Sequence, residues 1–332
     1  MRLAQVNISK EHMENLNGVP NISLLKDSSG LSYLSFRKKL TPTFYKVWID
    51  MALCLLMMAL PALFFKEAAG NSLIVITLIP LCALWSAYWI HAYGCFFHEG
   101  AHFNLHKNKP TNDMISNLLL TPFFGMLVKS YRVSHWEHHK HLGTGKDTEI
   151  SYLSALSITN LLKVFVGIYH LKTIIRYIQN FKSVGSQAHR NSKSTIFLFT
   201  LIFAVIVQVA IASLMFIYIS PAAGLSWAIA YFILYPMLAK IRQTLEHRSL
   251  DVKIIESSTE HGAVHRIFGT DSFSNYFGAA GFNRHLLHHY DPSISYTNFD
   301  ELEFFLKDTS VAEELFSNRT TYIKTFLNML ER

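Results

Sequence analysis

The sequence predicts an all-α integral membrane protein, in which two helical hairpins cross the bilayer four times and carry a helical cap on one face. Two observations support this fold class. Half of the 332 residues are hydrophobic and only 16% are charged, whereas soluble domains average about 25% charged residues. The apolar residues also gather in four long runs that are joined in pairs by short connectors. This composition disfavours a disordered chain and an ordinary soluble domain.

The four apolar runs predict the transmembrane spans. They cover about residues 47–65, 73–97, 196–219 and 222–238. A helix over the first run is about 28 Å long, which matches a hydrocarbon core of about 30 Å. We expect three parts in the chain: an N-terminal cytoplasmic segment over 1–46, a membrane domain over 47–305 and a C-terminal cytoplasmic helix over 306–332. Two shorter apolar segments, 115–128 and 153–178, predict helices in the membrane interface.

The distribution of basic residues predicts the orientation in the membrane. Of the 30 Lys and Arg residues, only Lys66 falls in a connector on the far side. The positive-inside rule therefore places both termini and the histidine clusters on the cytoplasmic face. The sequence is equally consistent with a location in a bacterial inner membrane and in the endoplasmic reticulum. The net charge of +7 accompanies apolar segments, so membrane lipids with anionic headgroups, and no nucleic acid, are the expected partners.

Histidine is the unusual component, with 17 copies of which nine fall in four clusters on the predicted cytoplasmic side. The first cluster has HxxxH spacing, which stacks two imidazoles on one helix face. Two later clusters share the spacing HxxHH, for which chance would give roughly 0.04 copies in such a chain. A single histidine directly follows the fourth run. The nine are His98, His102, His135, His138, His139, His247, His285, His288 and His289.

Nine imidazoles in these clusters predict a histidine-rich di-metal site. Neutral imidazole suits zinc, copper, iron or nickel, and nine donors are too many for one ion. Two metals with four or five nitrogen ligands each are the natural partition. The absence of thiolate in this set argues against structural zinc and favours a redox metal that activates oxygen. Glu99, Glu137 and Glu246 adjoin histidines and could orient metal-bound imidazoles.

The set HxxxH, HxxHH and HxxHH with two hairpins resembles the membrane fatty acid desaturase family, from about residue 70 to 305. The resemblance implies that all nine histidines hold a di-iron centre and that no catalytic residue beyond the metal ligands is needed. Gln243 lies where some relatives have a water-linked asparagine, so its glutamine departs from them. Asp147 closes the stretch that follows the second box, and Asn283 precedes the third box; both are further candidates for orienting a ligand.

The resemblance also implies the reaction. We expect an O2-dependent fatty acid desaturase that uses two iron ions to insert a carbon–carbon double bond into an acyl-lipid or acyl-thioester. The sequence contains no His-Pro-Gly-Gly segment, no GxGxxG after a strand and no cysteine set for an iron–sulfur cluster. A separate ferredoxin-like or cytochrome b5-like protein is therefore the expected electron donor.

Two alternatives remain open at the level of sequence. A di-iron hydroxylase or ketolase of an alkyl chain, carotenoid or sphingolipid would use the same scaffold. A membrane metal transporter is an alternative of another class, but transporters place polar ligands near the bilayer midplane, whereas these histidines lie outside the apolar cores. Regiochemistry, chain length, substrate carrier and oligomeric state do not follow from the residues.

Overall fold

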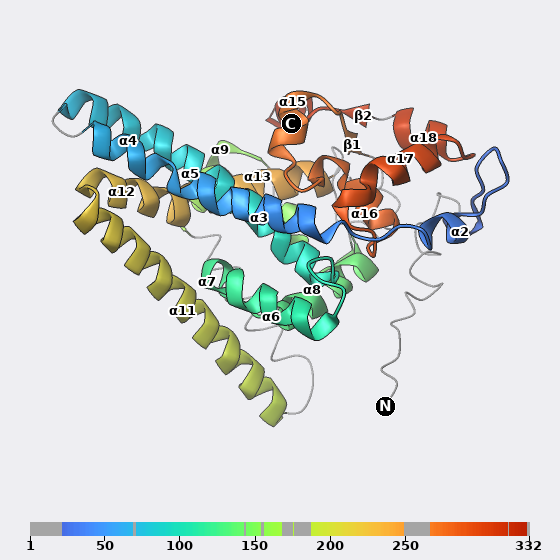
Figure 1. Cartoon of the computed structure of the whole chain (residues 1–332), viewed down its shortest axis with the longest axis horizontal. Helices are drawn as coiled ribbons and strands as arrows, with labels where there is room; N and C mark the ends of the chain where they lie inside the picture. Colours follow the sequence, from blue (N-terminus) through green and yellow to red (C-terminus); the bar gives the residue numbers. More distant parts are fainter. Residues whose placement is uncertain are drawn as a thin grey trace. The chain divides into compact units, whose positions relative to one another are not determined.

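The computed structural model describes residues 22–68, 71–142, 144–153, 156–167, 175, 187–248, 266–317 and 319–330 (Figure 1). Over these ranges the chain is mainly helical, and a two-stranded parallel sheet pairs β1 (Ile267–Phe268) with β2 (Arg319–Thr320). The predicted all-α membrane fold is confirmed, since four helices are long and apolar enough to cross a membrane. Residues 1–21 and most of the predicted interface segment beyond residue 167 lie outside the described residues.

The four candidate spans are Phe44–Glu67, Ser72–Ala101, Thr195–Tyr218 and Pro221–His247. They are built from α3 (Phe44–Ala59) with α4 (Pro61–Glu67), α5 (Ser72–Ala101), α11 (Gln187–Tyr218), and α12 (Pro221–Ile229) with η3 (Ala230–Leu234) and α13 (Tyr235–His247).

Local sequence explains where the second helix of each hairpin begins. The Asn71 side chain accepts a hydrogen bond from the backbone N–H of Ile74 and so caps α5. Ser220 caps α12 in the same way, and Pro221 occupies its first turn, where a missing N–H costs nothing. Gly224 lets α12 approach α11 closely, because a Cβ there would lie 2.6 Å from the carbonyl oxygen of Ala212.

The fourth span continues well beyond its apolar run. A wide turn, η3, has π-helical geometry and lies just before Pro236. Proline lacks an N–H and its ring clashes with the carbonyl four residues earlier, so a regular α-turn cannot continue through it. The wide turn accommodates this residue, and α13 then runs to His247. His247 therefore stands at the end of the same helical rod that forms the fourth span.

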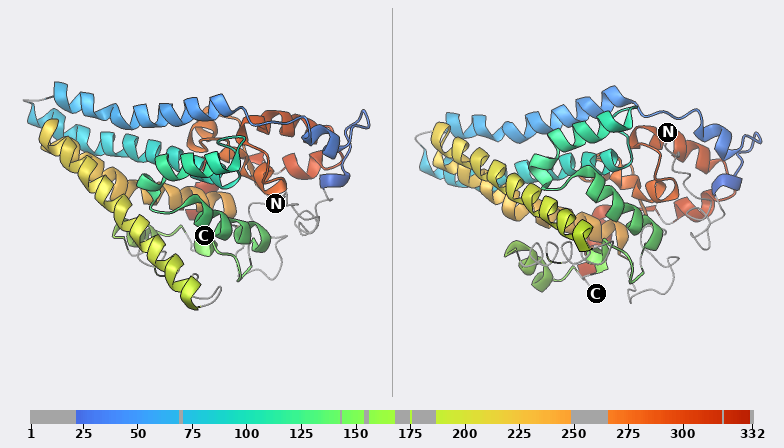
Figure 2. Two further views of the ribbon diagram at one scale, coloured as in Figure 1. Left: turned by 60° about the horizontal axis from the view of Figure 1, so that its bottom comes forward. Right: turned by 90° about the horizontal axis from the view of Figure 1, so that it is seen from below.

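The chain forms two compact units. The span unit comprises Tyr45–Tyr131 and Leu156–Ile241, and in both views of Figure 2 its α11 and α12 run side by side. It also contains α6 (Lys109–Leu119), α7 (Thr121–Phe124) and α9 (Ile158–Phe165). The histidine unit comprises Met1–Phe44, Arg132–Ala155 and Arg242–Arg332.

The histidine unit consists of short helices around a buried aromatic and aliphatic core that includes Tyr33, Tyr152, Phe268 and Leu302. Besides the two strands and the end of α13, its elements are η1 (Ile22–Leu24), α2 (Tyr33–Arg37), most of α8 (Val128–His141), η2 (Ile150–Leu153), α15 (Ser272–Phe277), η5 (Phe282–Arg284), α16 (His285–Tyr290), η6 (Tyr296–Asn298), α17 (Phe299–Lys307), α18 (Ala312–Ser317) and α19 (Tyr322–Leu330).

Candidate metal centre

The two HxxHH boxes lie on helices, α8 and α16. Residues four apart share a helix face, while the third histidine of the box is rotated away from that pair. In α8, His135 and His139 bring their Nε2 atoms to 3.0 Å. In α16, His285 and His289 do the same at 3.0 Å. The spacing therefore produces one close pair and one separately directed imidazole in each box.

Histidines from α8, α13 and α16 make a first group of ring nitrogens. The Nε2 atoms of His247, His285 and His289 form a triangle with sides of 3.0, 3.0 and 3.2 Å. A nitrogen of His138 lies within 4.8 Å of nitrogens of His247 and His289. We call these four residues group 1; all are buried.

A second group takes the remaining histidines of the two boxes. The Nε2 atom of His139 lies 3.0 Å from that of His135 and 3.0 Å from that of His288. These three residues, group 2, are also buried. The close pair of α16 belongs to group 1 and that of α8 belongs to group 2. The single imidazole of each helix belongs to the other group, so α8 and α16 both contribute to both groups.

The first box lies in the span unit, at the end of α5. His98 and His102 are buried, and their ring centroids are 4.8 Å apart. The carboxylate of Glu99 lies 3.6 Å from Nδ1 of His98. Coordination of a metal by this pair remains a prediction.

Two carboxylates orient imidazoles of the second box. Asp147 Oδ1 lies 2.8 Å from Nδ1 of His138, and its other oxygen accepts a hydrogen bond from the Tyr152 hydroxyl. Glu149 Oε1 lies 3.0 Å from Nδ1 of His135. A carboxylate that accepts the Nδ1 proton leaves Nε2 as the metal-binding nitrogen.

The pKa shifts agree with these contacts. Burial disfavours the charged form of both acids, but the neighbouring histidines outweigh it and lower the pKa of Asp147 and of Glu149. Burial likewise opposes protonation of His138, yet Asp147 and Glu149 raise its pKa. For His135 burial outweighs Glu149, and its pKa is lowered. Both carboxyl groups are therefore ionised acceptors at neutral pH.

The histidine unit fits a bound metal. Nε2 of His138 is buried and has no hydrogen-bond partner among the described residues. In group 1 three nitrogens face one another at 3.0–3.2 Å. Ligands that bind one ion at about 2.1 Å and at right angles are about 3.0 Å apart. A metal ion would satisfy these nitrogens together, and imidazole-only ligation suits iron as well as zinc and copper.

Two of the other predicted orienting residues lie beside His247. Its Nδ1 is 3.1 Å from the backbone carbonyl of Gln243, whose side-chain oxygen accepts a hydrogen bond from Ser151 at 2.7 Å. Glu246 is buried and offers an oxygen within 4.8 Å of nitrogens of His247 and His285. The same carboxylate accepts hydrogen bonds from Tyr322 at 2.7 Å and from Arg242.

The last two predicted orienting residues contact other groups. Glu137 is half exposed, and its carboxylate lies 3.5 Å from Nε2 of His141. Asn283 donates a hydrogen bond to the side chain of Asn275 at 2.8 Å. Within the part of the chain that the structure describes, neither Glu137 nor Asn283 hydrogen-bonds or pairs with a histidine of group 1 or group 2, whereas Asp147 does.

Three residues of the site were missed by sequence reasoning. Glu149 could have been found, since it follows Asp147 by two residues after the second box and a pair of acids there can serve two imidazoles. Tyr152, whose ring stacks on His247 with centroids 5.3 Å apart, and Tyr322, which contacts Glu246, have no motif of their own. Their roles depend on tertiary packing.

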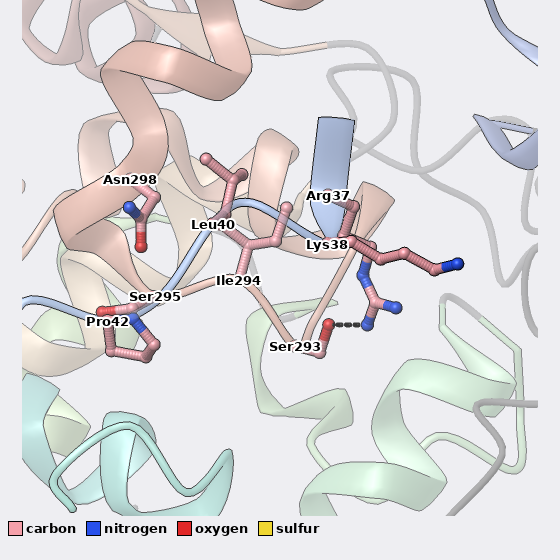
Figure 3. Close-up of a pocket in the computed structure, with 8 residues that line it drawn as sticks. All are labelled: Arg37, Lys38, Leu40, Pro42, Ser293, Ile294, Ser295 and Asn298. Carbon is pink, nitrogen blue, oxygen red and sulfur yellow. Dashed lines mark hydrogen bonds between the residues drawn. The ribbon is translucent and has the colours of Figure 1, made fainter. Parts of the chain in front are cut away.

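The third box is held at its end by the N-terminal part of the histidine unit. Asp291, which is 2% exposed, accepts a hydrogen bond from the Tyr33 hydroxyl at 2.7 Å and pairs with the Arg37 guanidinium at 2.5 Å. Arg37 also donates to the Ser293 hydroxyl (Figure 3). Beside this cluster lies an open cavity of about 300 Å³, lined by Arg37, Lys38, Leu40, Pro42, Ser293, Ile294, Ser295 and Asn298.

Comparison with known proteins decides the family. The family model for fatty acid desaturases matches residues 71–313, which include all nine histidines. The chain belongs to the fatty acid desaturase family. The resemblance seen in the sequence is thus confirmed, although no curated protein matches the chain. As a member of this family, the protein is an oxidoreductase of the desaturase or hydroxylase type, with membrane helices and histidine groups that can bind metal.

Proposed function

We propose that the protein is an O2-dependent membrane desaturase, which inserts a double bond into the acyl chain of a lipid or thioester by means of two iron ions. The observation that carries this proposal is the presence of two buried histidine groups in a member of the fatty acid desaturase family. Both HxxHH boxes contribute histidines to both groups. No side chain can oxidise an unactivated methylene group, so the chemistry requires a redox metal with O2.

In this proposal the four histidines of group 1 hold one ion. Group 2, completed by His98 and His102, holds the other. Bound iron supplies the oxidation of the carbon–hydrogen bonds with O2. Asp147 and Glu149 hold the Nδ1 protons of His138 and His135 and so keep the opposite nitrogens directed at the metals. Burial of the histidines excludes bulk water from the reacting groups.

Electrons come from outside the chain in this proposal. We propose that a ferredoxin-like or cytochrome b5-like protein docks on the face that carries the histidine unit, and that this face and both termini are cytoplasmic. The net charge of +7 favours an acidic donor, because complementary charge accelerates and orients docking.

Product analysis tests the reaction. The full chain is expressed in a host that lacks polyunsaturated lipids, and the fatty acids are identified by mass spectrometry. New double bonds are expected with the wild type and none with His138→Ala or His288→Ala, one variant for each group. His141→Ala is the matched control, because His141 is 26% exposed and pairs with Glu137. New hydroxyl groups without double bonds would replace the desaturase assignment by that of a hydroxylase.

Metal analysis tests the cofactor separately. Purified protein is expected to contain two iron ions per chain, and each of the two alanine variants is expected to lose at least one of them. A preparation that is active with zinc alone would refute the di-iron proposal.

A further inference from the structure

We propose that Tyr322 of the C-terminal helix α19 is a positioning residue for the metal site of group 1, and that it acts through the carboxylate of Glu246. The inference rests on the proposed function for the ion that group 1 holds, and it extends the metal site to a helix that carries no histidine. Helix α19 lies beyond residue 313, where the match to the family model ends. The family match therefore does not account for this contact.

The Glu246 carboxylate lies beside two ligands of group 1. Glu246 is 2% exposed and directly precedes His247. One of its oxygens lies within 4.8 Å of a nitrogen of His247 and of a nitrogen of His285. Two donors hold this carboxylate, the Tyr322 hydroxyl at 2.7 Å and the Arg242 guanidinium at 3.0 Å. A buried carboxylate needs such partners, so the loss of one changes where the group can lie.

Tyr322 is itself held by aromatic contacts within the histidine unit. Its side chain is 1% exposed. The ring stacks on that of Phe268, with centroids 3.8 Å apart and planes at 8°, and it meets the ring of Phe277 edge-on at 5.0 Å. Phe268 belongs to β1, and its partner strand β2 ends two residues before Tyr322. The sheet therefore fixes the position of the hydroxyl that Glu246 receives.

A second path leads from Glu246 to His285. The guanidinium of Arg242, which pairs with Glu246, lies 4.0 Å above the centre of the Phe282 ring. The Phe282 ring in turn stacks on His285, with centroids 4.8 Å apart and planes at 16°. The carboxylate is thus joined to His247 by the peptide chain and to His285 through Arg242 and Phe282. Its position affects two ligands of the same ion.

The backbone around His247 has a separate support. Arg266 donates hydrogen bonds to the backbone carbonyl groups of Leu245 and Arg248, at the end of α13. Cationic donors at this end of a helix satisfy carbonyls that lack a helical partner. Removal of the Tyr322 hydroxyl therefore leaves α13 intact, and it changes only the side chain of Glu246 and what that side chain contacts.

Binding of Co2+ to the full chain in detergent tests the inference. All variants carry His135→Ala, which removes a nitrogen of group 2 and leaves the four histidines of group 1. The visible absorption of Co2+ reports its ligands and their geometry. Glu246→Gln is expected to lower the affinity for Co2+ by about 10- to 100-fold, and Tyr322→Phe, which acts through one more residue, by about tenfold. Tyr276→Phe, at a residue of α15 that is 46% exposed, is the matched control and should leave the affinity unchanged.

The double variant separates positioning from a general loss of packing. If Tyr322 acts through Glu246, the addition of Tyr322→Phe to Glu246→Gln should change the affinity by less than about twofold. A loss of packing would instead add the same tenfold effect in both backgrounds, even if Tyr322→Phe lowers the melting temperature of the metal-free protein. Additive losses would therefore overturn the inference, as would equal Co2+ affinities for Tyr322→Phe and Tyr276→Phe.

The binding measurement needs neither an electron donor nor an acyl substrate, so it is independent of turnover. Co2+ affinity that depends on Tyr322 in a chain that forms no double bond would refute the proposed reaction but retain the role of Tyr322. Double-bond formation with Co2+ affinity that does not depend on Tyr322 would do the reverse. A chain that binds no Co2+ in group 1 would refute both.

Discussion

At the scale of single residues, Asp147 determines which nitrogen of His138 is available to a metal. An imidazole has two nitrogens, and the one that carries the proton cannot bind an ion. Because Asp147 accepts at Nδ1, the proton is held there and Nε2 keeps its lone pair. The Tyr152 hydroxyl in turn fixes the carboxylate. A chain of two contacts thus sets the direction of one ligand.

Asp147→Asn tests this role. The amide retains the size of the carboxyl group but loses its charge and can present a donor to Nδ1. Loss of such an orienting partner typically lowers metal affinity by about 10- to 100-fold. Competition with a chromogenic chelator measures this affinity. Glu137→Gln is the control, because Glu137 pairs with the partly exposed His141; equal affinities for the two variants would show that Asp147 does not orient a ligand.

Glu303 predicts how the stability of the histidine unit depends on pH. Its carboxylate pairs with Lys307 at 2.8 Å and Arg319 at 2.6 Å. Burial would raise the pKa of Glu303, but these cations outweigh it and lower the pKa. A carboxyl group whose pKa is lower in the folded state stabilises that state above its unfolded pKa of about 4.5, and the contribution is lost as pH falls through the folded value.

Loss of a hydrogen bond to a charged group lowers the free energy of unfolding by on the order of 1–3 kcal/mol. We therefore expect Glu303→Gln to lower the melting temperature by a few degrees at pH 7. The difference from the wild type should shrink below about pH 4, as the native carboxylate takes up a proton. Thermal unfolding in detergent at several pH values measures both effects. Glu301→Gln on the same helix is exposed and should change the melting temperature little; a pH-independent loss in Glu303→Gln would contradict the ion-pair explanation.

At the scale of elements, helix periodicity explains what could be predicted and what could not. The HxxHH spacing predicts that three imidazoles of each box can converge from a single turn, whereas the structure brings only the first and last of them together in α8 and in α16. Spacing alone does not predict that the middle histidine of each box lies with the close pair of the other box, because this arrangement depends on how α8 and α16 pack. The same limit applies to Tyr152 and Tyr322, which reach the site only through packing. Hydropathy found the fourth span but not its continuation to His247, since α13 is polar.

The wide turn η3 yields a prediction about the fourth span. A π-turn holds one residue more than a regular α-turn, so deletion of Phe232 within it, combined with Pro236→Ala to remove the proline that the turn accommodates, can restore regular helix and keep the direction of α13. Deletion of Ala239 in α13 instead rotates His247 by about 100°. We expect metal content to be retained in the first deletion and lost in the second, as measured by elemental analysis. Equal loss in both would show that the turn itself is required.

At the scale of the whole molecule, the apolar runs and the basic residues predict which side of the membrane each part faces. Glu67 ends the first candidate span, and Glu301 lies in the histidine unit; both are exposed. The three native cysteines are buried. A membrane-impermeant thiol reagent should therefore label Glu67→Cys from outside intact cells and Glu301→Cys only after the cells are opened. Labelling of both from the same side would refute the predicted topology.

The histidine unit is assembled from separate stretches of chain, and the metal groups join them. His139 and His288, whose nitrogens are 3.0 Å apart, are separated by 149 residues in sequence. An ion that bridges such distant stretches stabilises the folded unit, because it binds the assembled groups and not the open chain; at a free concentration 100 times the Kd this amounts to about 2.7 kcal/mol. Removal of metal should loosen α8 and α16, which carry the histidines of both groups, more than the apolar α11 and α12. Hydrogen exchange before and after chelation measures this, with exchange expected to rise in the two box helices and to stay unchanged in the hairpin.

His141→Ala should respond like the wild type, whereas His288→Ala should already show the faster exchange of α16 before chelation. An equal rise in all four helices would mean that the metals support the whole fold and not the histidine unit.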